Sequence, residues 1–461
     1  MVRAMDRLKA LRVGLGRSLF PDSRAAATTF GRGEAALLVA ALLVLGIVLQ
    51  LARIGWTGSL DALWAEDGAI FLPGALTQSF GHAIGSEYSG YLVLVPRLIG
   101  EVASALPLRD APAVFSILSA ALVALSGLIV WHASSGHISS PYLRGALALA
   151  TVLTPVGGQE TIDSASYVSW SMLVATFWLL LWRPRTQSAA VAGGLFILLT
   201  ALSNPGVWFF LPLALLRALA ARDRRDWTLL AAYFADAAAQ VVATVHSSYD
   251  AIEPLWTGDI WTVLLQRVVD GTAFGLRLGG IAWVHLGWPF LIVLTALAVA
   301  GLALGIRHAA WSARCLAAVA VPTALMMFVA SIYQRAVATP MLWSAGAHNG
   351  AAGRYAIVPV MLLIGVGMAL IDSWERRPDA PGRRPWLSLA AAGLVLVSVA
   401  ISFPAWNTDV RGTPNWSSSL DSAAASCESE NLPDVAVPIS PPGFGVQLSC
   451  GVIPGSSRPQ R

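Results

Sequence analysis

The chain has 461 residues, of which 56% are hydrophobic and 12% are charged, and its mean hydropathy is +0.65. A soluble protein of this length needs far more charge to cover its surface, so the composition excludes that class and indicates a polytopic membrane protein in contact with membrane lipids. The formal net charge of +4 does not indicate nucleic-acid binding, because the arginines lie scattered in short loops and form no single patch with interleaved aromatics. We therefore expect no nucleic-acid partner.

The chain begins with a basic segment, residues 1–34, which precedes the first apolar run at residues 35–54. This run is long enough to cross a bilayer and lacks a small-residue cleavage site, so it is expected to be a retained anchor and not a signal peptide. Because basic loops stay on the cytoplasmic side, the N-terminus is predicted to be cytoplasmic.

Arginine-rich connections recur between the later apolar runs and serve as a reference for topology. They predict an all-α protein with about eleven membrane spans, near residues 35–54, 111–132, 142–156, 167–182, 188–203, 205–221, 227–245, 285–306, 313–333, 354–373 and 386–404. The outer face then receives residues 55–110, 157–166, 246–284, 334–353 and the tail from 405. The short third span, and a break at 204–206 where residues 188–221 could form a re-entrant pair, leave the count open by about two.

Two adjacent carboxylates, Glu66 and Asp67, follow the first span in an apolar and aromatic setting. A carboxylate costs roughly 2.5–3.5 kcal/mol at the centre of a membrane helix and less near its surface, so a pair kept at this boundary points to function. The alternative is that one of them only caps a helix. Later in the same loop, residues 91–106 have the apolar periodicity of a helix lying along the membrane surface, with Arg97 and Glu101 spaced to share one face.

The C-terminal tail, residues 405–461, is rich in Pro, Ser and Gly and contains short apolar alternations typical of strands. Cys427 and Cys450 both lie in it, and the predicted outer location permits a disulfide between them. Two unpaired thiols are the alternative. We expect a small outer cap closed by that bridge, after a transmembrane domain at residues 35–404.

Three short stretches, Trp64–Phe71, Gly90–Arg97 and Gly353–Tyr355, together with the long first outer loop, the many spans and the outer tail, resemble the GT-C superfamily of membrane glycosyltransferases. Within it, the chain is most similar to an uncharacterised bacterial branch. The resemblance implies transfer of a sugar from a polyprenyl-phosphate donor to a hydroxyl of a lipid-linked or cell-envelope glycan acceptor. The reaction would take place on the outer face of a bacterial cell (inner) membrane.

In that family an acid of the first outer loop acts as the base, which implies Asp67 here, with Glu66 as the second choice. A single positioned base predicts inversion at the sugar carbon. The departing phosphate needs a cation, for which Arg354 beside Tyr355 is preferred, with Arg97 and Arg335 as further candidates unless they only contact lipid headgroups. Further substrate contacts are expected from Trp64, Tyr91 and His348.

The motifs leave cofactor use open. No cofactor is required by the motifs, but some relatives use a divalent metal held by acids such as Glu66, Asp67, Glu160 and Asp163. A transporter or flippase of lipid-linked sugars would also be polytopic with outer arginines, and a glycan ligase or polymerase would share most of the chemistry. Transporters, however, show matched halves and charges near the bilayer midplane, whereas the ionisable residues here lie mainly in loops.

Overall fold

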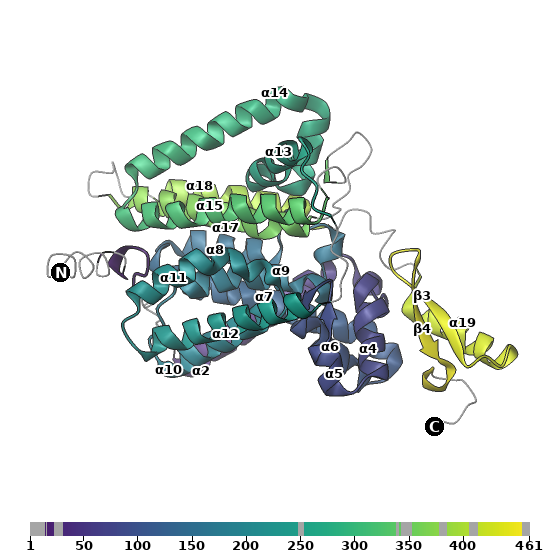
Figure 1. The fold of residues 1–461 in the computed structure, drawn as a ribbon. Coiled ribbons are helices and arrows are strands. Elements are labelled where there is room, and N and C mark those ends of the chain that lie inside the picture. The colour runs from purple at the N-terminus through teal and green to yellow at the C-terminus, as the bar shows by residue number, and fades with distance from the viewer. Residues whose placement is uncertain are drawn as a thin grey trace.

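The structure is a computed structural model that describes residues 14, 16–22, 31–247, 253–337, 341–342, 353–377, 385–404 and 414–453. This part of the chain is almost entirely helical, and its only strands form two short antiparallel hairpins. Figure 1 shows the long helices lying side by side as a bundle, with the C-terminal cap at one end.

The helices of the bundle are α2 (Arg32–Ala52), α7 (Ala111–Ala133), α8 (Pro141–Val152), α9 (Ala165–Leu181), α10 (Gln187–Ala201), α11 (Leu211–Ala220), α12 (Arg224–His246), α13 (Asp259–Leu264), α14 (Gly271–His308), α15 (Trp311–Gln334), α17 (Arg354–Glu375) and α18 (Trp386–Ser402). Short 3-10 turns are η2 (Leu108–Asp110), η3 (Ser134–Gly136), η4 (Gln159–Thr161) and η5 (Pro205–Phe210), and η6 (Leu265–Asp270) is π-helical.

Helices occupy all eleven predicted spans, which confirms an all-α polytopic membrane protein. In the described part of the chain, six helices are long and apolar enough to cross a membrane: Gly33–Ala52, Leu108–Gly136, Arg224–His246, Asp259–His308, Trp311–Gln334 and Arg354–Glu375. Four shorter apolar helices are Ala165–Leu181, Gln187–Ala201, Pro205–Ala220 and Trp386–Ser402. Within Asp259–His308 the direction changes at Gly275 and Gly287, whose positive φ angles interrupt the helix.

The predicted third span, 142–156, is only partly helical. Its helix α8 has 12 residues, about 18 Å at 1.5 Å per residue, which is too short for a hydrocarbon core of about 30 Å. The chain nevertheless passes from one end of the bundle to the other. Before α8, the Ser139 and Ser140 amides donate to Asp372 near the end of α17, and after it Glu160 bonds Arg354 at the start of α17.

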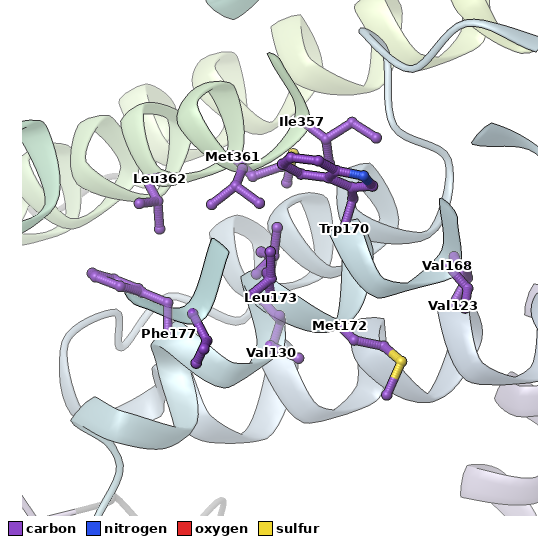
Figure 2. Packing of buried hydrophobic residues seen from close by; sticks show 14 of the residues in the cluster. Val123, Val130, Val168, Trp170, Met172, Leu173, Phe177, Ile357, Met361 and Leu362 are labelled. Carbon is purple, nitrogen blue, oxygen red and sulfur yellow. The ribbon is translucent and has the colours of Figure 1, made fainter. Parts of the chain in front are cut away.

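Helix α9 is the centre of the bundle and is buried around its whole circumference. Figure 2 shows its Trp170, Leu173 and Phe177 packed between α7 and the Ile357–Leu362 face of α17. A helix that is apolar on every side must be surrounded by other helices. Because α9 is held on all sides, its first residues are expected to have little freedom to move.

Arginines hold together the end of the bundle opposite the cap. Arg217 is buried and its Nη2 lies 2.8 Å from the Asp226 carboxylate, while Arg183 Nε donates to the Phe20 carbonyl oxygen at 2.6 Å. Asp223 begins α12 by accepting hydrogen bonds from the Arg225 and Asp226 amides, as expected for a helix N-cap. This is the end that the positive-inside rule assigns to the cytoplasm.

The first outer loop folds at the other end (Figure 1). It contains α3 (Trp56–Leu60), the π-helical turn η1 (Asp67–Phe71), α4 (Leu72–Thr77), α5 (Phe80–Gly85), a hairpin of β1 (Glu87–Tyr88) and β2 (Tyr91–Leu92), and α6 (Leu94–Ser104). The amphipathic helix expected at 91–106 is α6, three residues shorter at its start because Tyr91 and Leu92 pair in the hairpin.

The C-terminal cap, here residues 414–453, consists of α19 (Trp416–Ser429), the hairpin of β3 (Asp434–Ile439) and β4 (Phe444–Ser449), and the turn η8 (Cys450–Val452). Its expected strands are present. Cys427 and Cys450 form a disulfide with a Cα–Cα distance of 5.8 Å, which confirms the predicted bridge.

Candidate active site

A cavity of about 340 Å³ opens at the end of the bundle that carries the first outer loop. The loop ends that the topology assigns to the outer face converge on it. Its wall comes from the first outer loop, the start of α9, the α10–η5 connection, the end of α15 and the start of α17, with Glu66, Tyr88, Tyr91, Ser166, Tyr167, Trp170, Asn204, Gln334, Arg335, Arg354 and Tyr355 among the lining residues.

Glu66 is the carboxylate that faces this cavity. Its carboxylate accepts hydrogen bonds from the hydroxyl groups of Tyr167, at 3.0 and 3.1 Å, and of Tyr88, at 3.3 Å. The residue before it, Ala65, has φ 35°, a left-handed conformation that costs a non-glycine residue about 1–3 kcal/mol. The π-helical turn η1 follows directly, and such turns are frequent at functional sites.

Asp67 points the other way and is 1% exposed. Its carboxylate accepts hydrogen bonds from the amides of Ala165, at 3.1 Å, and Ser166, at 3.0 Å, and from the Ser166 hydroxyl at 2.7 Å. These are the first amides of α9, whose positive end favours a negative charge. Asp67 is not among the described residues that line the cavity, so its carboxylate is engaged by α9, whereas that of Glu66 faces the cavity.

The tyrosines of the loop hairpin keep their protons. Burial, together with the nearby Glu66 carboxylate, raises the pKa of Tyr88, and burial raises the pKa of Tyr91. A neutral Tyr88 can donate to Glu66, which holds that carboxylate in one orientation. The phenol rings thus form a polar but uncharged wall beside the acid.

Arg354 lines the cavity but already has an anionic partner. Its Nη1 lies 2.6 Å from Glu160 Oε2, and its guanidinium lies 4.8 Å from the ring centroids of both Tyr167 and Tyr355. The Tyr355 ring in turn packs edge-on against Trp170. The carboxylate of Glu160, on η4, therefore neutralises Arg354, which was the first candidate to bind the carrier phosphate.

Arg335 lies at the end of α15 and also lines the cavity. Its guanidinium lies 5.8 Å from the centroid of the Tyr91 ring. Within the described residues no carboxylate pairs with it. His348 lies outside the described residues.

Two further candidates lie away from the cavity among the residues described. Arg97 is buried on α6, where its Nη2 donates to the Glu87 carbonyl oxygen at 3.2 Å and its guanidinium lies over the Phe71 ring. Burial lowers the pKa of Arg97. Trp64 is 7% exposed and pairs with Ser440 of the cap. Both therefore take part in packing the first outer loop.

The four acids considered as metal ligands separate in the structure. Glu66 contacts two tyrosines, Asp67 contacts α9, Glu160 contacts Arg354, and Asp163 accepts a hydrogen bond from the Ser59 hydroxyl at 2.6 Å. In the ranges that the structure describes, no group of three or more His, Cys, Asp or Glu gathers that could hold a metal ion. Among the described residues, these four acids therefore do not come together as a metal site.

Sequence reasoning missed several cavity residues. Tyr88 and Tyr167 carried no motif of their own, although Tyr88 lies within the predicted first outer loop and Tyr167 begins a predicted span. Asn204 was recognised only as a helix break; its side chain accepts from the Gly206 amide at 2.8 Å and donates to Ser169 at 3.0 Å. Polar or aromatic residues at the outer ends of several spans would have been the signal.

No family model and no curated protein matches the chain. Among solved structures, it is similar to the arabinofuranosyltransferase AftD from mycobacteria, with a TM-score of 0.45 and 16% sequence identity, over 88% of this chain and 29% of AftD. It is also similar to the oligosaccharyltransferase of Archaeoglobus fulgidus, solved in complex with zinc and sulfate, with a TM-score of 0.36 and 16% identity, over 85% of this chain and 56% of that one. The chain thus spans less than two thirds of the length of either protein.

Proposed function

We propose that this chain is a membrane glycosyltransferase of the GT-C type, which transfers a sugar from a polyprenyl-phosphate donor to a hydroxyl of a lipid-linked or cell-envelope glycan. The observation that carries the proposal is one cavity that combines the Glu66 carboxylate with the Arg335 guanidinium. An acceptor hydroxyl needs a base and a departing phosphate needs a cation, and these two groups supply them.

The proposed reaction is a direct displacement. Glu66 takes the proton of the acceptor hydroxyl while that oxygen forms a bond to the sugar carbon. The bond from that carbon to the phosphate oxygen breaks, its electron pair stays on the polyprenyl phosphate, and the configuration inverts. Arg335 holds the phosphate oxygens, and Tyr88 and Tyr167 hold Glu66 toward the cavity. The cavity opens on the side assigned here to the outside of a bacterial cell membrane, with a cytoplasmic N-terminus and an outer cap.

The experiment is turnover of a panel of radiolabelled pentoses and hexoses linked to polyprenyl phosphate, in membranes that contain the wild-type chain or empty membranes. Release of polyprenyl phosphate together with a labelled glycan product would support the proposal. A flippase would instead move the intact labelled lipid from one leaflet of a liposome bilayer to the other without consuming it, and that result would exclude a transferase. A ligase or polymerase would transfer only preassembled glycans.

Arg335→Ala is expected to raise the donor KM by about 10- to 100-fold with a smaller change in kcat. Hydrogen bonds to charged groups contribute roughly 1.5–3 kcal/mol, and among the described residues no carboxylate forms an ion pair with Arg335. The measurement is initial rate against donor concentration. Arg109→Ala is the matched control, since Arg109 pairs with Asp421 at the surface of the cap; equal KM values for the two variants would contradict the assignment.

A further inference from the structure

The backbone just before Glu66 is bound to the C-terminal cap. The Ser440 amide donates to the Leu63 carbonyl oxygen at 3.0 Å, and the Ser440 carbonyl oxygen accepts from the Ala65 amide at 2.5 Å. Ser440 directly follows strand β3, and it forms a parallel β-bridge with Trp64, which lies two residues before Glu66. The left-handed Ala65 therefore lies between a backbone clamp from the cap and the residue proposed as the base.

Side-chain packing reinforces this clamp. Ile439, the last residue of β3, is 1% exposed and lies so close to Gly68 that a Cβ on that glycine would stand 2.7 Å from Ile439 Cδ1. Gly68 belongs to the π-helical turn that begins after Glu66. The cap thus contacts the acid-bearing segment on both sides of Glu66.

A second anchor fixes the cap to the start of the same segment. The Asp61 carboxylate accepts from the Ser417 amide at 2.8 Å and from its hydroxyl at 2.6 Å. The Trp416 indole donates to the Leu108 carbonyl oxygen at 2.9 Å. Because the Cys427–Cys450 disulfide joins α19 to the end of β4, both anchors belong to one covalently closed unit.

We infer that the cap is a positioning element for Glu66, with Ile439 and Ser440 holding the turn that presents this carboxylate to the cavity. The inference rests on the proposed function, because it assumes that Glu66 is the base. Asp67 secures the other side of the same turn to α9, so Glu66 is oriented by two elements that are far apart in the sequence. Neither Ile439 nor Ser440 is among the described residues that line the cavity; Ser440 acts through its backbone hydrogen bonds and Ile439 through its side-chain packing beside Gly68.

The test is Gly68→Ala, assayed with whichever radiolabelled polyprenyl-phosphate sugar of the panel the wild-type chain consumes. The new methyl group would stand 2.7 Å from Ile439 Cδ1 and 3.1 Å from Leu63 Cβ, so the turn or the Ile439 side chain must move. We expect kcat to fall about tenfold or more, since small displacements of a catalytic group are costly, and the donor KM to change less than about twofold because the Arg335 wall is untouched. Ile439→Val removes the Cδ1 atom, which is the nearest atom to the new methyl group, so the double variant is expected to recover part of kcat.

Gly81→Ala is the matched control, because Gly81 lies in α5 of the same loop and a Cβ there meets nothing within 4 Å; its kinetics should equal wild type. Unfolding temperature and folded fraction are measured for every variant. A loss of kcat fully accounted for by the unfolded fraction would overturn the inference, as would an unchanged kcat in Gly68→Ala.

Asp61→Asn keeps the inference testable if Gly68→Ala does not fold, since it weakens the other anchor without adding bulk. A lower kcat with unchanged donor KM supports positioning by the cap, and wild-type kcat overturns it. Glu66→Gln distinguishes a failure of the cap inference from a failure of Glu66 as the base. If Glu66→Gln is inactive while Gly68→Ala and Asp61→Asn keep the wild-type kcat, only the cap inference fails; if Glu66→Gln stays fully active, the proposed base itself fails.

Discussion

Glu66→Gln is expected to lower the rate of sugar transfer by about 10²- to 10⁴-fold, the usual contribution of a positioned general base. The amide keeps the size of the side chain and still accepts hydrogen bonds from Tyr88 and Tyr167, but it cannot take the acceptor proton. The unfolding temperature and the donor KM should therefore remain close to wild type. The measurement is single-turnover transfer with saturating labelled donor.

Asp67→Asn is the matched control for this prediction, because it removes the neighbouring charge with the same chemical change. Three hydrogen bonds join the Asp67 carboxylate to α9, so the variant is expected to lose about 1–3 kcal/mol of stability. Transfer per folded molecule should fall much less than in Glu66→Gln. The reverse order, with Asp67→Asn folded but inactive and Glu66→Gln active, would return the base to Asp67.

Arg354→Ala is expected to lower the free energy of unfolding by about 3 kcal/mol, because it removes the cation that contacts the Glu160 carboxylate in a largely buried site. It also removes the guanidinium packed against the rings of Tyr167 and Tyr355. The measurement is thermal unfolding in detergent, followed by tryptophan fluorescence. Removing both charges in Arg354→Met/Glu160→Gln should restore most of the stability.

The donor KM of that double variant separates the two roles considered for Arg354. If Glu160 already neutralises its charge, the KM stays within about threefold of wild type. A KM raised as far as in Arg335→Ala, with normal stability of the single variant, would make Arg354 a phosphate ligand. Arg109→Ala breaks an exposed pair, whose side chains are 48% and 64% exposed, and should cost at most about 1 kcal/mol.

The architecture was largely predictable because a bilayer imposes length and hydrophobicity on every helix that crosses it. Residues 35–54, 313–333 and 354–373 each became one helix within a few residues of the expected bounds. The disulfide was predictable as well, since the tail has only two cysteines. The short third span was expected too, but the end of its helix at Val152 was not, because Leu153, Pro155 and Val156 continue the apolar run while the backbone leaves the helix.

The sequence by itself determined the membrane class, the apolar helical segments, the paired acids and the group of loops, predicted to lie outside, that meet at the cavity. Only the tertiary structure separated Glu66 from Asp67. Neighbouring residues have the same composition and spacing signals, but their directions depend on contacts from distant segments: α9 binds Asp67 and the cap binds Ala65. The same reason applies to Arg335 and Arg354. Both are arginines at the end of a span, so the sequence does not distinguish them. In the structure Glu160 neutralises Arg354, whereas Arg335 faces the cavity without a carboxylate partner among the described residues.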